Sequence, residues 1–130
     1  MSDQKREPIW IPLGTLHLLH DRQVELFGGL PGVRDEGAIE SALARPLKAW
    51  AYGRATDLEA LAATYLCALV QQQGYLDGNK RTALAAMLVF LKLNGRTIRA
   101  PGPELYAVVM AAARNEIGVE QVAEWIRRYG

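Results

Sequence analysis

The sequence lacks the features that mark several classes of protein. Its single cysteine, Cys67, cannot form an internal disulfide, and its place in the apolar run of residues 65–70 predicts a small buried side chain. No apolar stretch approaches the roughly 18 residues that a membrane-spanning helix needs. The charged residues 1–8 also lack the apolar core of a secretory signal. We therefore expect a protein of the reducing cytoplasm with no membrane partner.

A strong net charge is also missing. The chain has 15 basic and 14 acidic residues, which gives a formal net charge of +1. The broad positive field of a nucleic-acid-binding protein is therefore absent, and direct binding to DNA or RNA is not expected. Half of the residues are hydrophobic and 22% are charged, as in ordinary globular proteins, and 130 residues fit one domain.

Apolar residues recur at helical spacing in most of the chain. The strongest pattern follows a capping box, Thr56 to Glu59, and continues to about Gln72. This pattern and the remaining segments predict an all-α fold of about six helices, with an N-terminal tail (residues 1–12) and one compact domain (residues 13–130). End signals place the other helices over residues 13–27, from Asp35 to Pro46, from about Asn79 to Asn94, from Pro101, and from Val119 to the C-terminal end.

Residues 73–82, Gln-Gly-Tyr-Leu-Asp-Gly-Asn-Lys-Arg-Thr, combine charge with a turn at the start of a predicted helix. A helix N-terminus attracts anions through its unpaired N–H groups. Gly78 lets the backbone approach a ligand, and Lys80 and Arg81 add positive charge. Asp77 supplies the hard oxygen that Mg²⁺ prefers. Spacing alone leaves a phosphate-binding turn and an ordinary solvated turn equally open.

The same segment resembles the Fic/Doc signature. In words, this signature is His, any residue, Phe, any residue, Asp or Asn, Gly or Ala, then Asn, followed in the Doc branch by Lys-Arg-Thr. Tyr75 takes the aromatic place and Asp77 the acidic place. Fic enzymes have Gly where Lys80 stands and a second Arg where Leu84 stands, so both differences favour Doc. The resemblance covers roughly residues 13–128.

The resemblance implies a death-on-curing toxin of a toxin–antitoxin module with the Fic/Doc helical fold. Such a protein is a kinase-like phosphotransferase that moves the γ-phosphate of ATP to a threonine of elongation factor Tu and blocks translation. By resemblance, Gly78, Asn79, Lys80 and Arg81 would hold ATP, and Asp77 would hold Mg²⁺. A Phd-type antitoxin would be the partner, with a tail that folds as a helix in an apolar groove.

Gln73 departs from the family pattern, because it stands where the family has its general-base histidine. The register is secure, since no histidine follows His20. A glutamine amide can orient a nucleophile but cannot accept its proton, and a lost general base typically costs ~10²–10⁴-fold in rate. The catalytic set therefore becomes Gln73, Asp77, Lys80 and Arg81, and we expect the chain to be inactive or weakened.

Three explanations of Gln73 are open. The chain is an engineered inactive variant, because an active toxin kills its expression host; or it is a naturally degenerate member; or a loose transition state needs little help from a base. We favour the first. A non-catalytic nucleotide- or antitoxin-binding module and a Fic-type adenylyltransferase remain as alternatives, and a small helical nucleic-acid binder is a weaker one.

Two other groups of residues invite a functional interpretation. His17, His20 and Asp21 offer three metal ligands, but we favour a structural role for His20. Residues 45–56 show no clean helical period and are predicted to form a loop or flap. Their basic and aromatic side chains suit either a flap over the nucleotide or a surface that stacks nucleic-acid bases, and the low net charge favours the flap. These side chains are Arg45, Lys48, Trp50, Tyr52 and Arg54.

Overall fold

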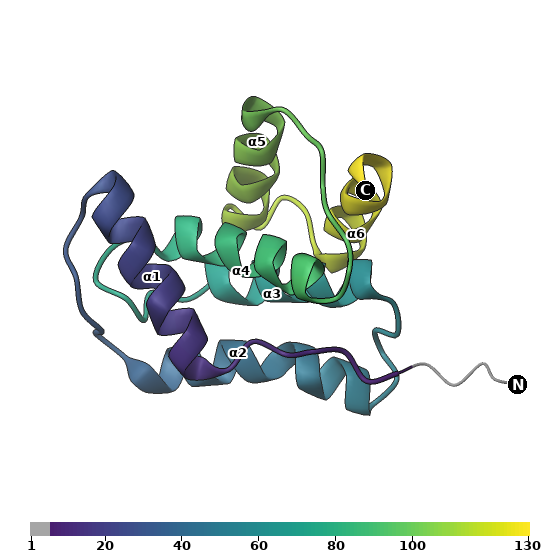
Figure 1. The fold of residues 1–130 in the computed structure, drawn as a ribbon, viewed down its shortest axis with the longest axis horizontal. Coiled ribbons are helices and arrows are strands. Elements are labelled where there is room, and N and C mark those ends of the chain that lie inside the picture. The colour runs from purple at the N-terminus through teal and green to yellow at the C-terminus, as the bar shows by residue number, and fades with distance from the viewer. Residues whose placement is uncertain (1–5) are drawn as a thin grey trace, which may run out of the picture.

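The computed structural model describes residues 6–130, and within that range it contains six α-helices and no β-strand (Figure 1). This confirms the predicted all-α fold of about six helices. None of these helices is long and apolar enough to cross a membrane. Along the chain they are α1 (Leu13–Phe27), α2 (Glu36–Ala51), α3 (Leu58–Val70), α4 (Asn79–Leu93), α5 (Gly102–Ala113) and α6 (Val119–Tyr129).

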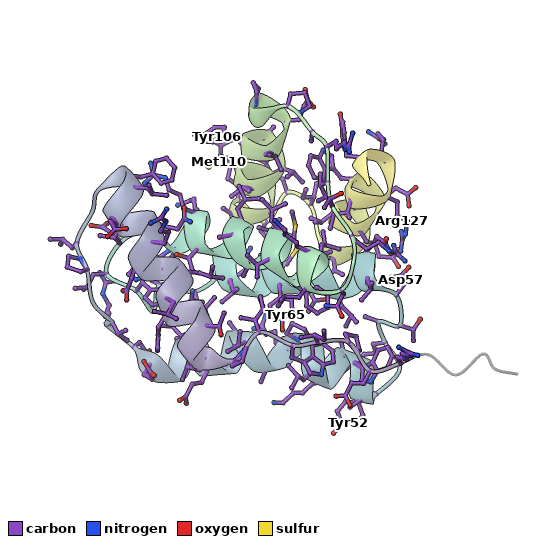
Figure 2. The ribbon with its side chains drawn as sticks, viewed as in Figure 1. Tyr52, Asp57, Tyr65, Tyr106, Met110 and Arg127 are labelled. Carbon is purple, nitrogen blue, oxygen red and sulfur yellow. The ribbon has the colours of Figure 1, made fainter. Side chains whose placement is uncertain are left out.

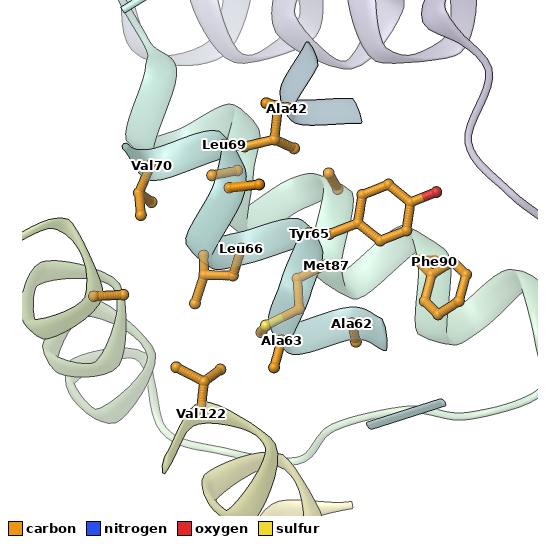
Figure 3. Close-up of a cluster of buried hydrophobic side chains, with 14 of the residues drawn as sticks. Ala42, Ala62, Ala63, Tyr65, Leu66, Leu69, Val70, Met87, Phe90 and Val122 are labelled. Carbon is orange, nitrogen blue, oxygen red and sulfur yellow. The ribbon is translucent and has the colours of Figure 1, made fainter. Parts of the chain in front are cut away.

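Helix α3 forms the centre of the molecule, and α2, α4, α5 and α6 all pack against it. Every residue from Leu61 to Leu66 is buried, because the helix is apolar on nearly all sides. Figure 3 shows Tyr65 and Leu66 of α3 among Met87 and Phe90 of α4 and Val122 of α6. This packing fixes α3 against α4, and with them the segment that connects the two helices.

The segment before α1 packs on this core. Ile11 is only 2% exposed, and its N–H donates a hydrogen bond of 3.1 Å to the Tyr65 hydroxyl. Burial raises the pKa of that hydroxyl, so it stays protonated. The Trp10 ring stacks on Phe90 with centroids 5.9 Å apart. These contacts fasten the start of α1 to α3 and α4.

The prediction that Pro46 ends the second helix is wrong. Helix α2 continues through Pro46 to Ala51, so only the end of the predicted 45–56 loop is non-helical. An interior proline removes one helical hydrogen bond and costs about 3 kcal/mol. Here the proline ring is buried, and beyond it Trp50 packs edge-on against Trp10 at 6.4 Å. Tertiary burial therefore outweighs the local preference.

The predicted cap of α3 is also displaced by one residue. Asp57, not Thr56, is the N-cap, and its Oδ1 accepts a hydrogen bond of 2.9 Å from the Ala60 N–H. Its Oδ2 accepts a second hydrogen bond, of 2.8 Å, from Arg127 of α6 (Figure 2). A carboxylate at this end also interacts favourably with the helix dipole, which explains the choice between two adjacent capping residues.

Candidate functional site

The segment between α3 and α4, residues 71–78, is here called the central turn. Two side-chain amides close it from within. Asn79 is 8% exposed; its Oδ1 accepts from the Tyr75 N–H at 3.0 Å, and its Nδ2 donates to the Tyr75 carbonyl at 2.9 Å. Gln72 accepts from the Gly74 N–H at 2.6 Å. The amide group of the Asn79 side chain is therefore used inside the turn.

Helix α4 begins directly after Gly78, which has left-handed backbone angles, φ 80° and ψ 16°. Glycine adopts this conformation without the steric cost that a side chain would add. The first helical hydrogen bond runs from the Thr82 N–H to the Gly78 carbonyl at 2.9 Å. Within residues 6–130, the N–H groups of residues 79–81 have no hydrogen-bond acceptor. Such a terminus binds anions.

The loop between α1 and α2 lies against the central turn. Val33 and Tyr75 form an isolated antiparallel bridge, and the Leu76 N–H donates to the Gly32 carbonyl at 3.1 Å. The Leu30 N–H donates to Asp77 Oδ2 at 2.7 Å. The sequence analysis did not indicate that these two segments lie together, whereas the structure joins them.

Two histidines of helix α1 contact the central turn. The buried His20 ring is stacked on the Tyr75 ring, with centroids 3.7 Å apart and an interplanar angle of 9°. Its Nε2 lies 2.7 Å from the Asp77 carbonyl oxygen. His17 Nδ1 lies 2.8 Å from the Tyr75 hydroxyl, and its Nε2 lies 3.2 Å from Glu36. Burial, and then the charges of Glu36 and Asp21, raise the pKa of Tyr75, so its hydroxyl remains protonated.

These contacts answer the question of a metal site on α1. Across residues 6–130, no three His, Cys, Asp or Glu side chains are placed to hold a metal ion. Both histidines are engaged by the central turn instead. The structure therefore supports the structural role that was favoured for His20, and the metal interpretation of His17, His20 and Asp21 is wrong.

A cavity of about 940 Å³ opens beside the central turn, between α1, α4 and α5. All six residues that the sequence analysis selected line it together. Its opposite wall is apolar, and Figure 2 shows two of the wall residues, Tyr106 and Met110, on the side of α5 that faces α1. The selected residues are Gln73, Asp77, Gly78, Asn79, Lys80 and Arg81, and the apolar wall includes Leu84, Leu88, Leu105, Tyr106, Val109 and Met110.

Phe27 lines the cavity, and the sequence analysis did not anticipate a role for it at the site. The Arg81 guanidinium lies over the Phe27 ring, 4.8 Å from its centroid, at the last position of α1. Phe27 is 58% exposed, so it contributes little to the core. A cation held over an aromatic face is restricted in orientation, and both side chains line the cavity. An aromatic residue at the end of an apolar stripe carries no sequence signal for this role.

The predicted flap is not beside this cavity. Arg45, Lys48 and Arg54 line a separate cavity of about 680 Å³ that also includes Glu124 and Arg127 of α6. Arg45 and Lys48 lie on α2, which continues past Pro46 to Ala51, and Arg54 follows the end of that helix; none of the three lines the cavity at the central turn. The interpretation of residues 45–56 as a flap over a nucleotide is therefore wrong.

Comparisons with known proteins identify the family of the chain. The sequence profile of the Fic/DOC family matches residues 10–91, which include α1 to α3, the central turn and most of α4. The chain is 42% identical over 113 residues to "Protein kinase doc" of Escherichia phage P1, which covers 86% of this chain and 89% of that protein. It is 45% identical over 71 residues to "Toxin Doc" of Mycolicibacterium smegmatis, which covers 53% of this chain and 54% of that protein. The chain therefore belongs to the Fic/DOC family, and within it is similar to the Doc toxins.

Proposed function

We propose that this protein is a Doc-type toxin whose site holds Mg²⁺–ATP for transfer of the γ-phosphate to a protein hydroxyl. The observation that carries the proposal is the free N-terminus of α4, which opens with Lys80 and Arg81 into a cavity of about 940 Å³. Cavities of this size accommodate cofactor-sized ligands. The name of the phage relative, a protein kinase, favours phosphotransfer.

The residues present fit a phosphate chain and its cation. The free N–H groups of residues 79–81 and the Arg81 guanidinium donate to phosphate oxygens, and Lys80 adds a point charge. Asp77 is exposed, and Leu30 engages only its Oδ2. The second oxygen is therefore left for Mg²⁺, which neutralises phosphate charge when bound.

Gln73 lies exposed on the rim of the same cavity. Its amide can donate a hydrogen bond to, or accept one from, the hydroxyl of the target, but it cannot take the proton. The site can therefore bind and orient its reactants while it lacks the group that would activate the nucleophile. We infer a nucleotide-binding protein with weak transfer activity.

The choice of γ-phosphate over AMP transfer rests on two positions. Lys80 stands where Fic enzymes have Gly, and Leu84 stands where they have a second Arg. Leu84 is half-buried in the cavity wall, so it offers neither charge nor hydrogen bonds to a phosphate. By resemblance, the proposed target is a threonine of elongation factor Tu, and the proposed consequence is blocked translation in the cytoplasm.

The apolar wall supports the proposed antitoxin partner. Similarity to a Doc toxin implies a toxin–antitoxin module. Phe27 and Tyr106 are 58% and 67% exposed on opposite sides of the cavity, with Leu88 between them on α4. Exposed apolar side chains that line a groove suit the apolar face of a helix. We propose that the tail of a Phd-type antitoxin lies there.

The test uses the purified chain, Gln73→His and Gln73→Asn with Mg²⁺ and ATP labelled on either the α- or the γ-phosphate, and with elongation factor Tu. All three should bind ATP. Gln73→His should increase γ-label transfer by roughly 10²–10⁴-fold, whereas Gln73→Asn, which also lacks a base, should remain at the level of the chain itself.

Two outcomes would contradict parts of the proposal. Transfer of the α-label by Gln73→His would identify an adenylyltransferase. No transfer to elongation factor Tu or to any other translation factor, with ATP binding intact, would leave a non-catalytic binding module.

A further inference from the structure

We propose that His20 is a positioning residue that locks the Asp77–Gly78 peptide with its N–H directed toward the anion site. The inference rests on the proposed function, because it concerns the same phosphate-binding turn. It adds a residue of α1 that is far from the motif in the sequence and does not itself line the cavity.

The His20 ring is held by Tyr75 at its face and by residues 77 and 78 at one edge. It is 2% exposed, and it lies parallel to Tyr75 with centroids 3.7 Å apart. The backbone of Gly78 lies near the Cδ2–Nε2 edge of the ring, where an added Cβ would lie 3.6 Å from His20 Cδ2 and 3.7 Å from His20 Nε2. The ring therefore has little freedom to rotate, and its nitrogens keep fixed directions.

The bond partner determines which nitrogen carries the proton. A carbonyl oxygen can only accept, so the contact of 2.7 Å between His20 Nε2 and the Asp77 oxygen requires a proton on Nε2. The other nitrogen, Nδ1, lies 3.9 Å from Asp21 Oδ1, which is beyond hydrogen-bond distance. His20 therefore acts on the turn as a donor, through Nε2 alone.

The hydrogen bond to the Asp77 carbonyl also fixes the direction of the Gly78 N–H, because both groups belong to one peptide unit. In a planar trans peptide the C=O and N–H bonds point in opposite directions. With its carbonyl directed at His20, the Asp77–Gly78 peptide turns the Gly78 N–H away from the His20 ring. Gly78 also lines the cavity. Its N–H thereby joins those of residues 79–81 as donors to one anion.

The backbone alone does not choose this orientation. Gly78 has φ 80°, and a glycine tolerates both directions of the preceding peptide without a steric cost. In the reversed peptide, the Asp77 carbonyl would face the phosphates and repel them. The hydrogen bond from His20 selects the orientation that binds.

The test compares His20→Phe with His20→Gln in the full chain. Phenylalanine can still stack on Tyr75 but has no donor, whereas the glutamine amide can still donate to Asp77. Titration calorimetry with Mg²⁺–ATP should show about 10- to 100-fold weaker binding for His20→Phe and a loss of about threefold or less for His20→Gln. Leu18→Ala, a change at a residue of the same helix that is 68% exposed and does not line the cavity, should bind within about twofold of the parent chain. Binding by His20→Phe within about twofold of the parent would overturn the lock.

Two further measurements separate this proposal from the proposed function. If the parent chain binds no ATP, the proposed function fails, but crystal structures of the two variants still report the lock. The Asp77 carbonyl should turn toward the cavity in His20→Phe, whereas in His20→Gln it should keep its orientation and accept a hydrogen bond from the glutamine amide. A carbonyl that keeps its orientation in His20→Phe refutes the lock. If His20→Phe does not fold, nitrogen-15 NMR of the parent is the readout. Its His20 proton should be on Nε2, and its Gly78 amide resonance should shift when ATP binds. A proton on Nδ1 alone, or a Gly78 amide that does not shift although ATP binds, refutes the lock.

Discussion

The Leu30 N–H donates a hydrogen bond of 2.7 Å to Asp77 Oδ2 across 47 residues of sequence. It joins the loop after α1 to the turn before α4. On the same side, a Cβ at Gly29 would lie only 3.1 Å from the Asp77 Cβ, so backbone and carboxylate are in close contact. One carboxylate oxygen is thereby held by the backbone, and Asp77 lines the cavity, so its carboxylate has a fixed place there.

Asp77→Asn tests this placement of the carboxylate. The asparagine oxygen can still accept from Leu30, so we expect the free energy of unfolding to change by less than about 1 kcal/mol. In the presence of Mg²⁺, ATP binding should weaken at least ~10-fold, because the hard anionic ligand is lost. Without Mg²⁺, the same variant should bind ATP as well as the parent or slightly better, because a negative charge beside the phosphates has been removed. Equal losses in both conditions would contradict a role for Asp77 in holding the cation.

Phe27→Ala tests the support of Arg81. An exposed cation–π contact contributes about 0.5–1 kcal/mol, so ATP affinity should fall roughly two- to fivefold. Stability should change little, since Phe27 is 58% exposed. Leu26→Ala is the matched control, because Leu26 is 56% exposed on the same helix end and does not line the cavity. Calorimetric titration of both variants with Mg²⁺–ATP should separate them, and equal affinities would show that the stacking does not position Arg81.

Gly74→Ala tests the packing of the central turn. A Cβ at this position would lie 2.3 Å from Ile39 Cγ1 and 2.8 Å from the Asp35 carbonyl oxygen. Since backbone and a buried side chain must both move, we expect a loss of about 3 kcal/mol and a fall in Tm of roughly 10 °C. Gly14→Ala, whose Cβ would meet nothing within 4 Å, is the control and should be neutral or up to about 1 kcal/mol more stable. A thermal scan in which both variants behave alike would contradict the packing argument.

Cys67 supplies a prediction of pH dependence. Burial raises the pKa of its thiol from 9.0 to about 11. The native thiol should therefore react with a disulfide reagent at pH 9 far more slowly than the thiol of the urea-unfolded chain. Above pH 9 the unfolded thiol ionises while the folded one keeps its proton, so stability should decline as pH rises toward 11. The free energy of unfolding, measured with urea, should fall from pH 9 to pH 11 more steeply for the parent than for Cys67→Ala, which has no thiol. Identical pH profiles for the two proteins would contradict the prediction.

Apolar spacing and the capping and stop residues near each helix end predicted most helix ends. The apolar spacing of residues 13–27 and the Asn-Gly stop after Leu93 coincide with α1 and α4, because these signals act within one helical turn. The same rules failed at Pro46, where burial of the ring and the packing of Trp50 extend α2. They also chose the wrong cap for α3, because the ion pair between Asp57 and Arg127 cannot be read from neighbouring residues.

By itself, the sequence determined the six helices and the order of an acid, a glycine and two cations at the start of α4. Both follow from periodicity and capping, which depend on residues a few positions apart. Only the tertiary structure decided how these groups are directed. His20 holds the Asp77 carbonyl, Leu30 holds its carboxylate and Phe27 holds Arg81, each from α1 or the loop that follows it. These contacts join residues about 50 positions apart, and they arise because packing of α1 against α4 brings them together.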